Sequence, residues 1–126
     1  MMALTVLLAA LCMKESVNKP APPDPVSQAA GYYMIKPIFV KDVNRILKRQ
    51  EFTLADRFDK VRATQMARIW FRHYEKPEWT KQDYILSFKM GVKGYRKAKS
   101  EGKISNADLV YADDVLNLME KYESER

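Results

Sequence analysis

The stretch "AALCMKESVNKPAPPDP" at residues 9–25 decides how the chain begins to fold. An apolar run that starts at the beginning of the chain ends here, and four prolines follow between positions 20 and 25. Proline lacks a backbone N–H and clashes with the preceding helical turn, so no helix continues through that segment. The sequence therefore predicts a first helix that ends before Pro20. Its apolar side chains recur at helical spacing, at Leu4, Leu7, Leu8, Leu11 and Cys12.

A targeting segment is the alternative interpretation of this apolar run, which has the length of a signal-peptide core. However, no Lys or Arg precedes it and no small-residue cleavage site follows it. Leu11 also stands directly before Cys12, where a lipoprotein signal has a small residue. The run is too short to span a bilayer. We therefore favour a buried first helix, which carries the charged Glu15 at its end.

The composition is typical of one folded domain over residues 1–126. Hydrophobic residues make up 47% of the chain and charged residues 30%, with only 4 Gly. A chain of this length buries most of its unfolded surface in a single core. The one cysteine, Cys12, cannot form an internal disulfide. The net charge of +6 favours anionic partners, namely nucleic acid, a membrane surface or an acidic cell-wall polymer.

Four more helices are predicted, at residues 37–49, 53–74, 80–91 and from residue 106 onward. Pro37 suits the first turn of the first of these. Thr53 is followed three residues later by Asp56, and Thr80 by Asp83, which resembles a capping box. The predicted core-facing side chains are Val40, Val43, Ile46, Leu47, Phe58, Val61, Met66, Ile69, Trp70, Tyr84, Ile85, Phe88, Tyr111, Val115, Leu118, Met119 and Tyr122.

Gly91 and Gly94 are predicted to end the helix that Thr80 begins. Residues 17–36 and 91–106 are expected to be irregular. No stretch alternates with the period of two that a half-buried strand requires. The predicted fold is therefore mainly α.

Several segments in this order carry a family resemblance. They are "ALCMKES", "QAAGYYMIKP", "KDVNRILKRQEFTLADRFD", "QMARIWFRHY", "ILSFKMGVKGYRKA" and "VYADDV". The ordered set resembles the lysozyme-like lytic transglycosylase superfamily, in particular a branch common in bacteriophages and bacteria. The resemblance covers nearly the whole chain and implies a compact, single-domain lysozyme-like fold.

The resemblance implies that Glu15 is the catalytic acid and base. Protonating a glycosidic oxygen near neutral pH requires a carboxyl group that keeps its proton above its solution pKa. An apolar setting and the negative end of a helix both raise the pKa of a carboxyl group. From spacing alone, Glu15 could instead be the first solvated residue after a core helix.

The resemblance also assigns substrate-binding positions, which are Ser16, Tyr33, Met34, Lys89, Gly91 and Tyr111. Trp79 is added because an aromatic ring in a loop can stack on a sugar. Two of these positions depart from the family pattern, because Met34 replaces a Gln and Lys89 replaces an Asn. A thioether makes no useful hydrogen bond, so Met34 alters sugar positioning or removes a competent active site.

Asp24 is the candidate for a second carboxylate, although capping or solvating its own loop is the simpler role. His73 is the only histidine, and with Cys12 it makes a poor metal site. We therefore expect no metal and no cofactor.

These features predict an enzyme that cleaves the β-1,4 bond between MurNAc and GlcNAc in peptidoglycan. Because hydrolysis uses a pair of carboxylates, a lytic transglycosylase is favoured over a hydrolytic lysozyme (muramidase). We expect an antimicrobial phage lysin (endolysin) held in the host cytoplasm before release to the cell wall, or an enzyme carried on the phage particle. The expected partner is the glycan strand, bound by a monomer with no membrane span.

Two alternatives remain. One is a catalytically inactive lysozyme-like protein that binds the wall, which Met34 and Lys89 keep open. The other is a basic helical module that binds nucleic acid, which is not favoured because acidic residues are interspersed. Its phosphate-binding face would use Arg45, Lys48, Arg49, Arg62, Arg68, Arg72, Lys93, Arg96, Lys97 and Lys99.

Overall fold

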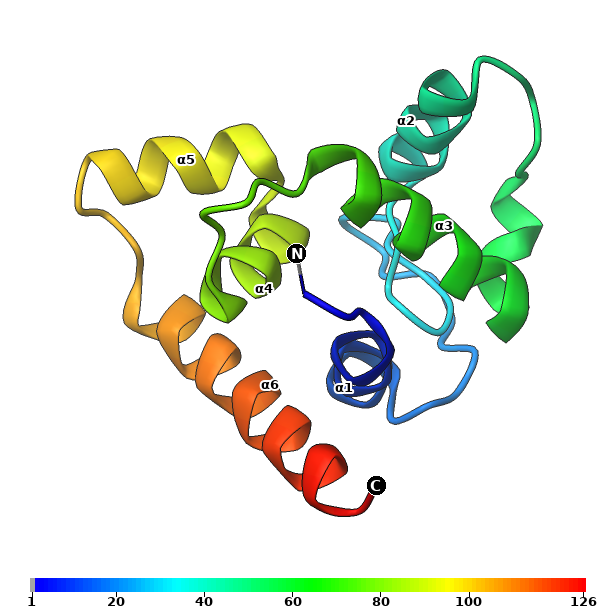
Figure 1. The fold of residues 1–126 in the computed structure, drawn as a ribbon. Helices are drawn as coiled ribbons and strands as arrows, with labels where there is room; N and C mark the ends of the chain where they lie inside the picture. Colours follow the sequence, from blue (N-terminus) through cyan, green and yellow to red (C-terminus); the bar gives the residue numbers. More distant parts are fainter. Residues whose placement is uncertain (1) are drawn as a thin grey trace. The chain divides into compact units, whose positions relative to one another are not determined.

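Helices connected by loops build residues 2–126, the part of the chain that this computed structural model describes (Figure 1). Within those residues the only β pairing is an isolated bridge between Ala30 and Ile35. The mainly α prediction is therefore confirmed. The elements are α1 (Thr5–Ser16), α2 (Pro37–Leu47), the 3₁₀ helix η1 (Leu54–Phe58), α3 (Lys60–Tyr74), α4 (Lys81–Met90), α5 (Val92–Ser100) and α6 (Asn106–Ser124).

Two compact units divide the chain. Unit 1 contains the chain up to Ala10 and Tyr74–Arg126, and unit 2 contains Leu11–His73. The boundary between them falls inside α1. The prediction of one domain over residues 1–126 stays a prediction. Among residues 2–126, no helix is long and apolar enough to cross a membrane.

Unit 1 is organised around α4, which contacts both α5 and α6. Three consecutive side chains of α4 are buried, those of Tyr84, Ile85 and Leu86. The predicted capping box at its start is confirmed, since Asp83 donates its backbone N–H to the Thr80 hydroxyl and accepts the Thr80 N–H. The buried side chains of α6 are Tyr111, Ala112, Val115 and Met119.

Aromatic side chains of α2 and α3 pack together in unit 2. Phe39 of α2 stacks on Trp70 of α3 with ring centroids 5.3 Å apart. The long irregular segment at residues 17–36 precedes these helices, as predicted. Asn44 is buried in α2 and exchanges hydrogen bonds with the backbone of Phe52, which ties the loop after α2 back to the helix.

Several predicted details of unit 2 are wrong. The helix predicted at residues 37–49 ends at Leu47, because Lys48 adopts a left-handed conformation with φ +58°. The capping box of Thr53 and Asp56 forms, but it begins η1, and α3 begins only at Lys60. Because α3 begins only at Lys60, the first two side chains that this helix was predicted to direct at the core point outward. Phe58 is 38% exposed and Val61 67% exposed.

The largest correction concerns residues 91–106, which were expected to be irregular. Gly91, with φ +82°, does end α4, but it also starts α5. Gly94 lies inside that helix rather than ending one. The physical reason is Tyr95, which is buried and donates its hydroxyl to Asp83 of α4, so tertiary contact outweighs the low helix propensity of glycine.

Candidate functional site

Glu15 is the next-to-last residue of α1 and lies in unit 2. Leu11 and Cys12, one turn earlier, are buried, and the Glu15 side chain is half-buried. The carboxyl group therefore stands where α1 leaves the core. This end of a helix carries partial negative charge.

The hydroxyl of Ser16 connects the end of α1 to the loop that follows. It donates to the carbonyl oxygen of Tyr32 at 2.7 Å and lies 3.1 Å from the carbonyl oxygen of Cys12. It also accepts the backbone N–H of Lys19 at 3.2 Å. Ser16 thus holds residues 31–35 beside the helix end that carries Glu15.

The loop at residues 31–35 is a tight, paired turn. Ala30 and Ile35 exchange backbone hydrogen bonds, and between them Met34 adopts φ +48°. Met34 is half-buried, whereas Tyr33 is 2% exposed and shares a 2.8 Å hydrogen bond with Thr64 of α3. Burial raises the pKa of the Tyr33 hydroxyl, despite that bond. Tyr33 therefore anchors the loop, and Met34 offers the more accessible side chain.

Arg57 is the support for this loop that sequence reasoning missed. Its guanidinium is buried and donates to the carbonyl oxygens of Gln28 at 2.8 Å, Ile35 at 3.0 Å and Leu54 at 2.9 Å. Burial lowers the pKa of this guanidinium. Arginine is rarely buried, so the only signal was its place inside the capped turn after Thr53.

Asp24 closes a turn of its own loop. Its Oδ1 atom accepts hydrogen bonds from the backbone of Val26 at 2.9 Å and from the backbone and hydroxyl of Ser27 at 2.8 Å and 3.2 Å. The backbone N–H of Ser27, followed by that of Val26, holds the pKa of the Asp24 carboxyl below its usual range. Asp24 therefore has the capping role that the sequence offered as the simpler one.

The other candidate residues lie in unit 1. Lys89, at the end of α4, forms a 2.6 Å ion pair with Asp108 of α6, and its ammonium lies 4.9 Å from the Tyr111 ring centroid. The hydrogen bond from Lys89 is the main cause that lowers the pKa of Asp108. Two of the predicted residues, Lys89 and Tyr111, are thus brought together, and the charge of Lys89 is balanced locally.

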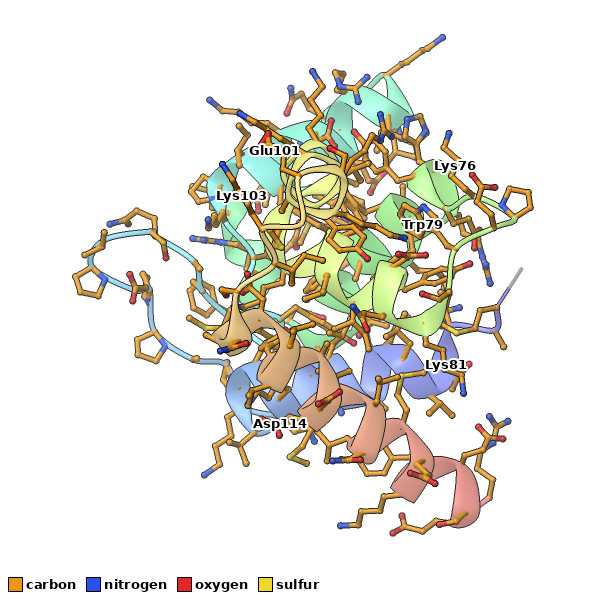
Figure 2. The ribbon with its side chains drawn as sticks, turned by 90° about the vertical axis from the view of Figure 1, so that its left-hand side faces the viewer. Lys76, Trp79, Lys81, Glu101, Lys103 and Asp114 are labelled. Carbon is orange, nitrogen blue, oxygen red and sulfur yellow. The ribbon has the colours of Figure 1, made fainter. Side chains whose placement is uncertain are left out.

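Gly91 and Trp79 have structural surroundings of their own. Gly91 needs its positive φ, but no atom lies within 4 Å of where a Cβ would be. Trp79 lies before α4 and packs edge-on against Tyr84, with ring centroids 5.1 Å apart. Figure 2 shows Trp79 on the same side of unit 1 as Lys76 and Lys81. Its ring is half-buried, so one part of it packs and another meets solvent.

A buried polar network in unit 1 was also missed. Asp83 is 4% exposed, and its Oδ1 atom accepts hydrogen bonds from the Tyr95 hydroxyl at 2.6 Å and the Lys99 ammonium at 2.9 Å. Burial alone raises the pKa of Asp83, but the bonds from Tyr95, Thr80 and Lys99 together hold it below its usual range. Asp83 joins α4 to α5 and is structural.

Comparisons of the chain with models of protein families, with curated proteins and with solved structures found no match. Across residues 2–126, no three His, Cys, Asp or Glu side chains are grouped so that they could hold a metal ion.

Proposed function

We propose that the protein cleaves the β-1,4 bond between MurNAc and GlcNAc in bacterial peptidoglycan, with Glu15 as the acid and base. The observation that carries the proposal is the place of Glu15, half-buried in the last turn of α1 and next to a serine that ties the helix end to residues 31–35. A carboxyl group at such a position can hold a proton for the leaving oxygen. The resemblance of the ordered sequence segments supports the same reaction.

The reaction we propose is that of a lytic transglycosylase. Glu15 first protonates the glycosidic oxygen and then, as a base, takes the proton from the 6-hydroxyl of the same muramic acid. That hydroxyl is tethered to the reacting carbon, so it replaces a positioned water. The Oδ1 atom of Asp24, the other candidate carboxylate, already accepts three hydrogen bonds within its loop, which supports a mechanism with one carboxylate.

The alternative is a protein that binds the wall without cleaving it, and the side chains of Met34 and Lys89 are the reason to consider it. Lys89 is engaged by Asp108, and the thioether of Met34 offers a sugar only an apolar contact. In the proposed enzyme, Met34 packs against a sugar face rather than bonding to a hydroxyl. A phage lysin, or an enzyme carried on the phage particle, is the setting that we propose for this activity.

Digestion of purified peptidoglycan tests the proposal, with mass analysis of the soluble fragments. The wild-type protein should release fragments ending in 1,6-anhydro-muramic acid, each lighter by one water than the hydrolytic product. Glu15→Gln keeps the side-chain volume but has no proton to transfer, so it should release none while retaining its helicity. Asp24→Asn, which keeps the acceptor oxygen of the turn, is the matched control and should stay active.

Two outcomes would contradict the mechanism. Reducing muramic acid ends that disappear in Asp24→Asn would make the protein a hydrolase with two carboxylates. Binding to the wall without any released fragment would favour the inactive wall-binding protein.

A further inference from the structure

The basic residues of the chain fall into two classes when their partners are considered. Three arginines of unit 2 that could contact phosphate are paired. Arg45 bonds to Asp42 at 2.7 Å, and Arg49 and Arg62 both bond to Glu51, at 3.1 Å and 3.0 Å. Their charges are therefore balanced within the protein and add little to an anion-binding surface.

Helix α5 belongs to the other class. It carries four basic residues and no acidic one. Lys99 points back to Asp83, together with the buried Tyr95, so this side of α5 faces α4. Lys93, Arg96 and Lys97 are exposed, and within residues 2–126 none of the three has an ion pair or a hydrogen bond from its side chain. Their spacing of three and four residues places them on one helix face.

The surroundings of α5 limit the size of this surface. Figure 2 views α5 nearly end-on, with Glu101 and Lys103 at its end. These two residues approach to 3.7 Å, so Lys103 has a neighbouring carboxylate. Helix α6, which like α5 packs on α4, carries five acidic residues and one basic residue. Lys93, Arg96 and Lys97 therefore form a narrow strip of uncompensated positive charge on α5.

We propose that Lys93, Arg96 and Lys97 form a binding strip for an anionic cell-wall polymer with repeating phosphodiester groups. Lys93 and Lys97 lie four residues apart, about 6 Å along the helix axis at 1.5 Å per residue, which suits two neighbouring charges of a flexible chain. The strip also lacks an exposed aromatic ring for base stacking, because Tyr95 is buried.

The choice of a wall polymer rests on the proposed function, since an enzyme of the cell wall meets such polymers next to its substrate. Binding at α5 would hold the protein at the wall between cleavage events. Because the attraction is between exposed charges, it should weaken as the Debye length falls below about 10 Å, near 0.1 M salt.

Equilibrium binding to purified poly(glycerol phosphate) tests the strip, with double-stranded DNA at equal phosphate concentration as the competing probe. The test variant combines Lys93→Gln, Arg96→Gln and Lys97→Gln, since glutamine keeps helix propensity. The matched control combines Lys19→Gln, Lys41→Gln and Lys121→Gln, which are exposed and remove the same charge elsewhere.

The wild-type protein should bind poly(glycerol phosphate) more tightly than DNA. The α5 variant should lose about a hundredfold in affinity at low salt, on a scale of about fivefold for each basic residue beside an anionic surface. Its plot of log affinity against log salt should be flatter by about 2. The control variant should stay within a few fold of wild type.

Three results would overturn the strip: no binding by the wild-type protein at low salt, equal losses in the two variants, or DNA bound as tightly as the polymer. The last result would favour the nucleic-acid module. Poly(glycerol phosphate) has no glycosidic bond to cleave, so binding is independent of turnover. Polymer binding without wall cleavage would contradict the proposed function and leave the strip in place.

Discussion

Gly31→Ala should be far more damaging than any other glycine substitution in the chain. Gly31 has φ +81°, and a Cβ built there would lie 1.9 Å from the carbonyl oxygen of Arg57 and 2.5 Å from its carbonyl carbon. Both contacts are with backbone, which cannot move aside as a side chain tip could. The substitution must therefore push residues 31–35 away from η1.

The loss of unfolding free energy caused by Gly31→Ala follows from separate contributions. A left-handed residue with a Cβ costs about 1–2 kcal/mol, and forced overlap in a packed site about 1–3 kcal/mol. The 3.2 Å bond from the Tyr32 N–H to the Arg57 carbonyl is lost as well, at about 1 kcal/mol. The restricted unfolded chain returns about 0.4–1 kcal/mol, which leaves a net loss of about 4 kcal/mol.

Thermal unfolding followed by far-UV circular dichroism measures this loss. With an unfolding entropy of about 2.1 cal/mol/K per residue, a chain of 126 residues should lose about 15 °C in Tm. Gly102→Ala is the control, since φ is +65° there but no atom lies within 4 Å of the added Cβ. Its Tm should fall by less than about 4 °C. Equal changes in the two variants would refute the reasoning that Gly31 is required by close approach.

Three further predictions concern stability. Val17 is 64% exposed and has φ +54°, a backbone conformation that a β-branched residue tolerates poorly. Val17→Gly should therefore raise Tm by about 2–4 °C in calorimetry. A lower Tm would argue against strain at this residue. Arg57→Met leaves three carbonyl groups without their donor, so it should lower the free energy of unfolding in urea by about 3 kcal/mol. Hydrogen exchange at residues 28–35 should become faster. Unchanged exchange would count against the supporting role of Arg57. The lowered pKa of Asp83 means that its stabilising effect is present above about pH 3.9 and is lost as the pH falls through the lower folded value. Asp83→Asn should therefore flatten the decline of the unfolding free energy between about pH 4 and pH 2. An unchanged slope would assign that decline to other carboxylates.

The sequence predicted those elements whose signals are local and unambiguous. The prolines at positions 20–25 correctly separate α1 from the rest, and the capping boxes at Thr53 and Thr80 both form. Local signals failed where a distant contact decides the structure. Gly94 sits inside α5 because Tyr95 is held by Asp83, a contact twelve residues apart in the chain.

The candidate site was predictable to the same degree. The position of Glu15 at a helix end follows from the apolar run and the prolines, and the structure has it there. The partners of Ser16 and Met34 could not be read from spacing, because they depend on a left-handed turn and on the buried Arg57. Likewise, nothing local indicates that Lys89 is neutralised by Asp108, nineteen residues later.

The buried thiol of Cys12 makes the end of α1 directly measurable. It is 2% exposed, donates a 3.4 Å hydrogen bond to Asn18, and burial raises its pKa. A thiol-labelling reagent attacks an exposed thiolate, so it reacts with this cysteine only when the chain around residues 12–18 opens. The labelling rate, compared with that of the denatured chain, gives the free energy of this local opening. The labelling rate of the single native cysteine thus reports the local opening of the helix end that carries Glu15, without an engineered probe.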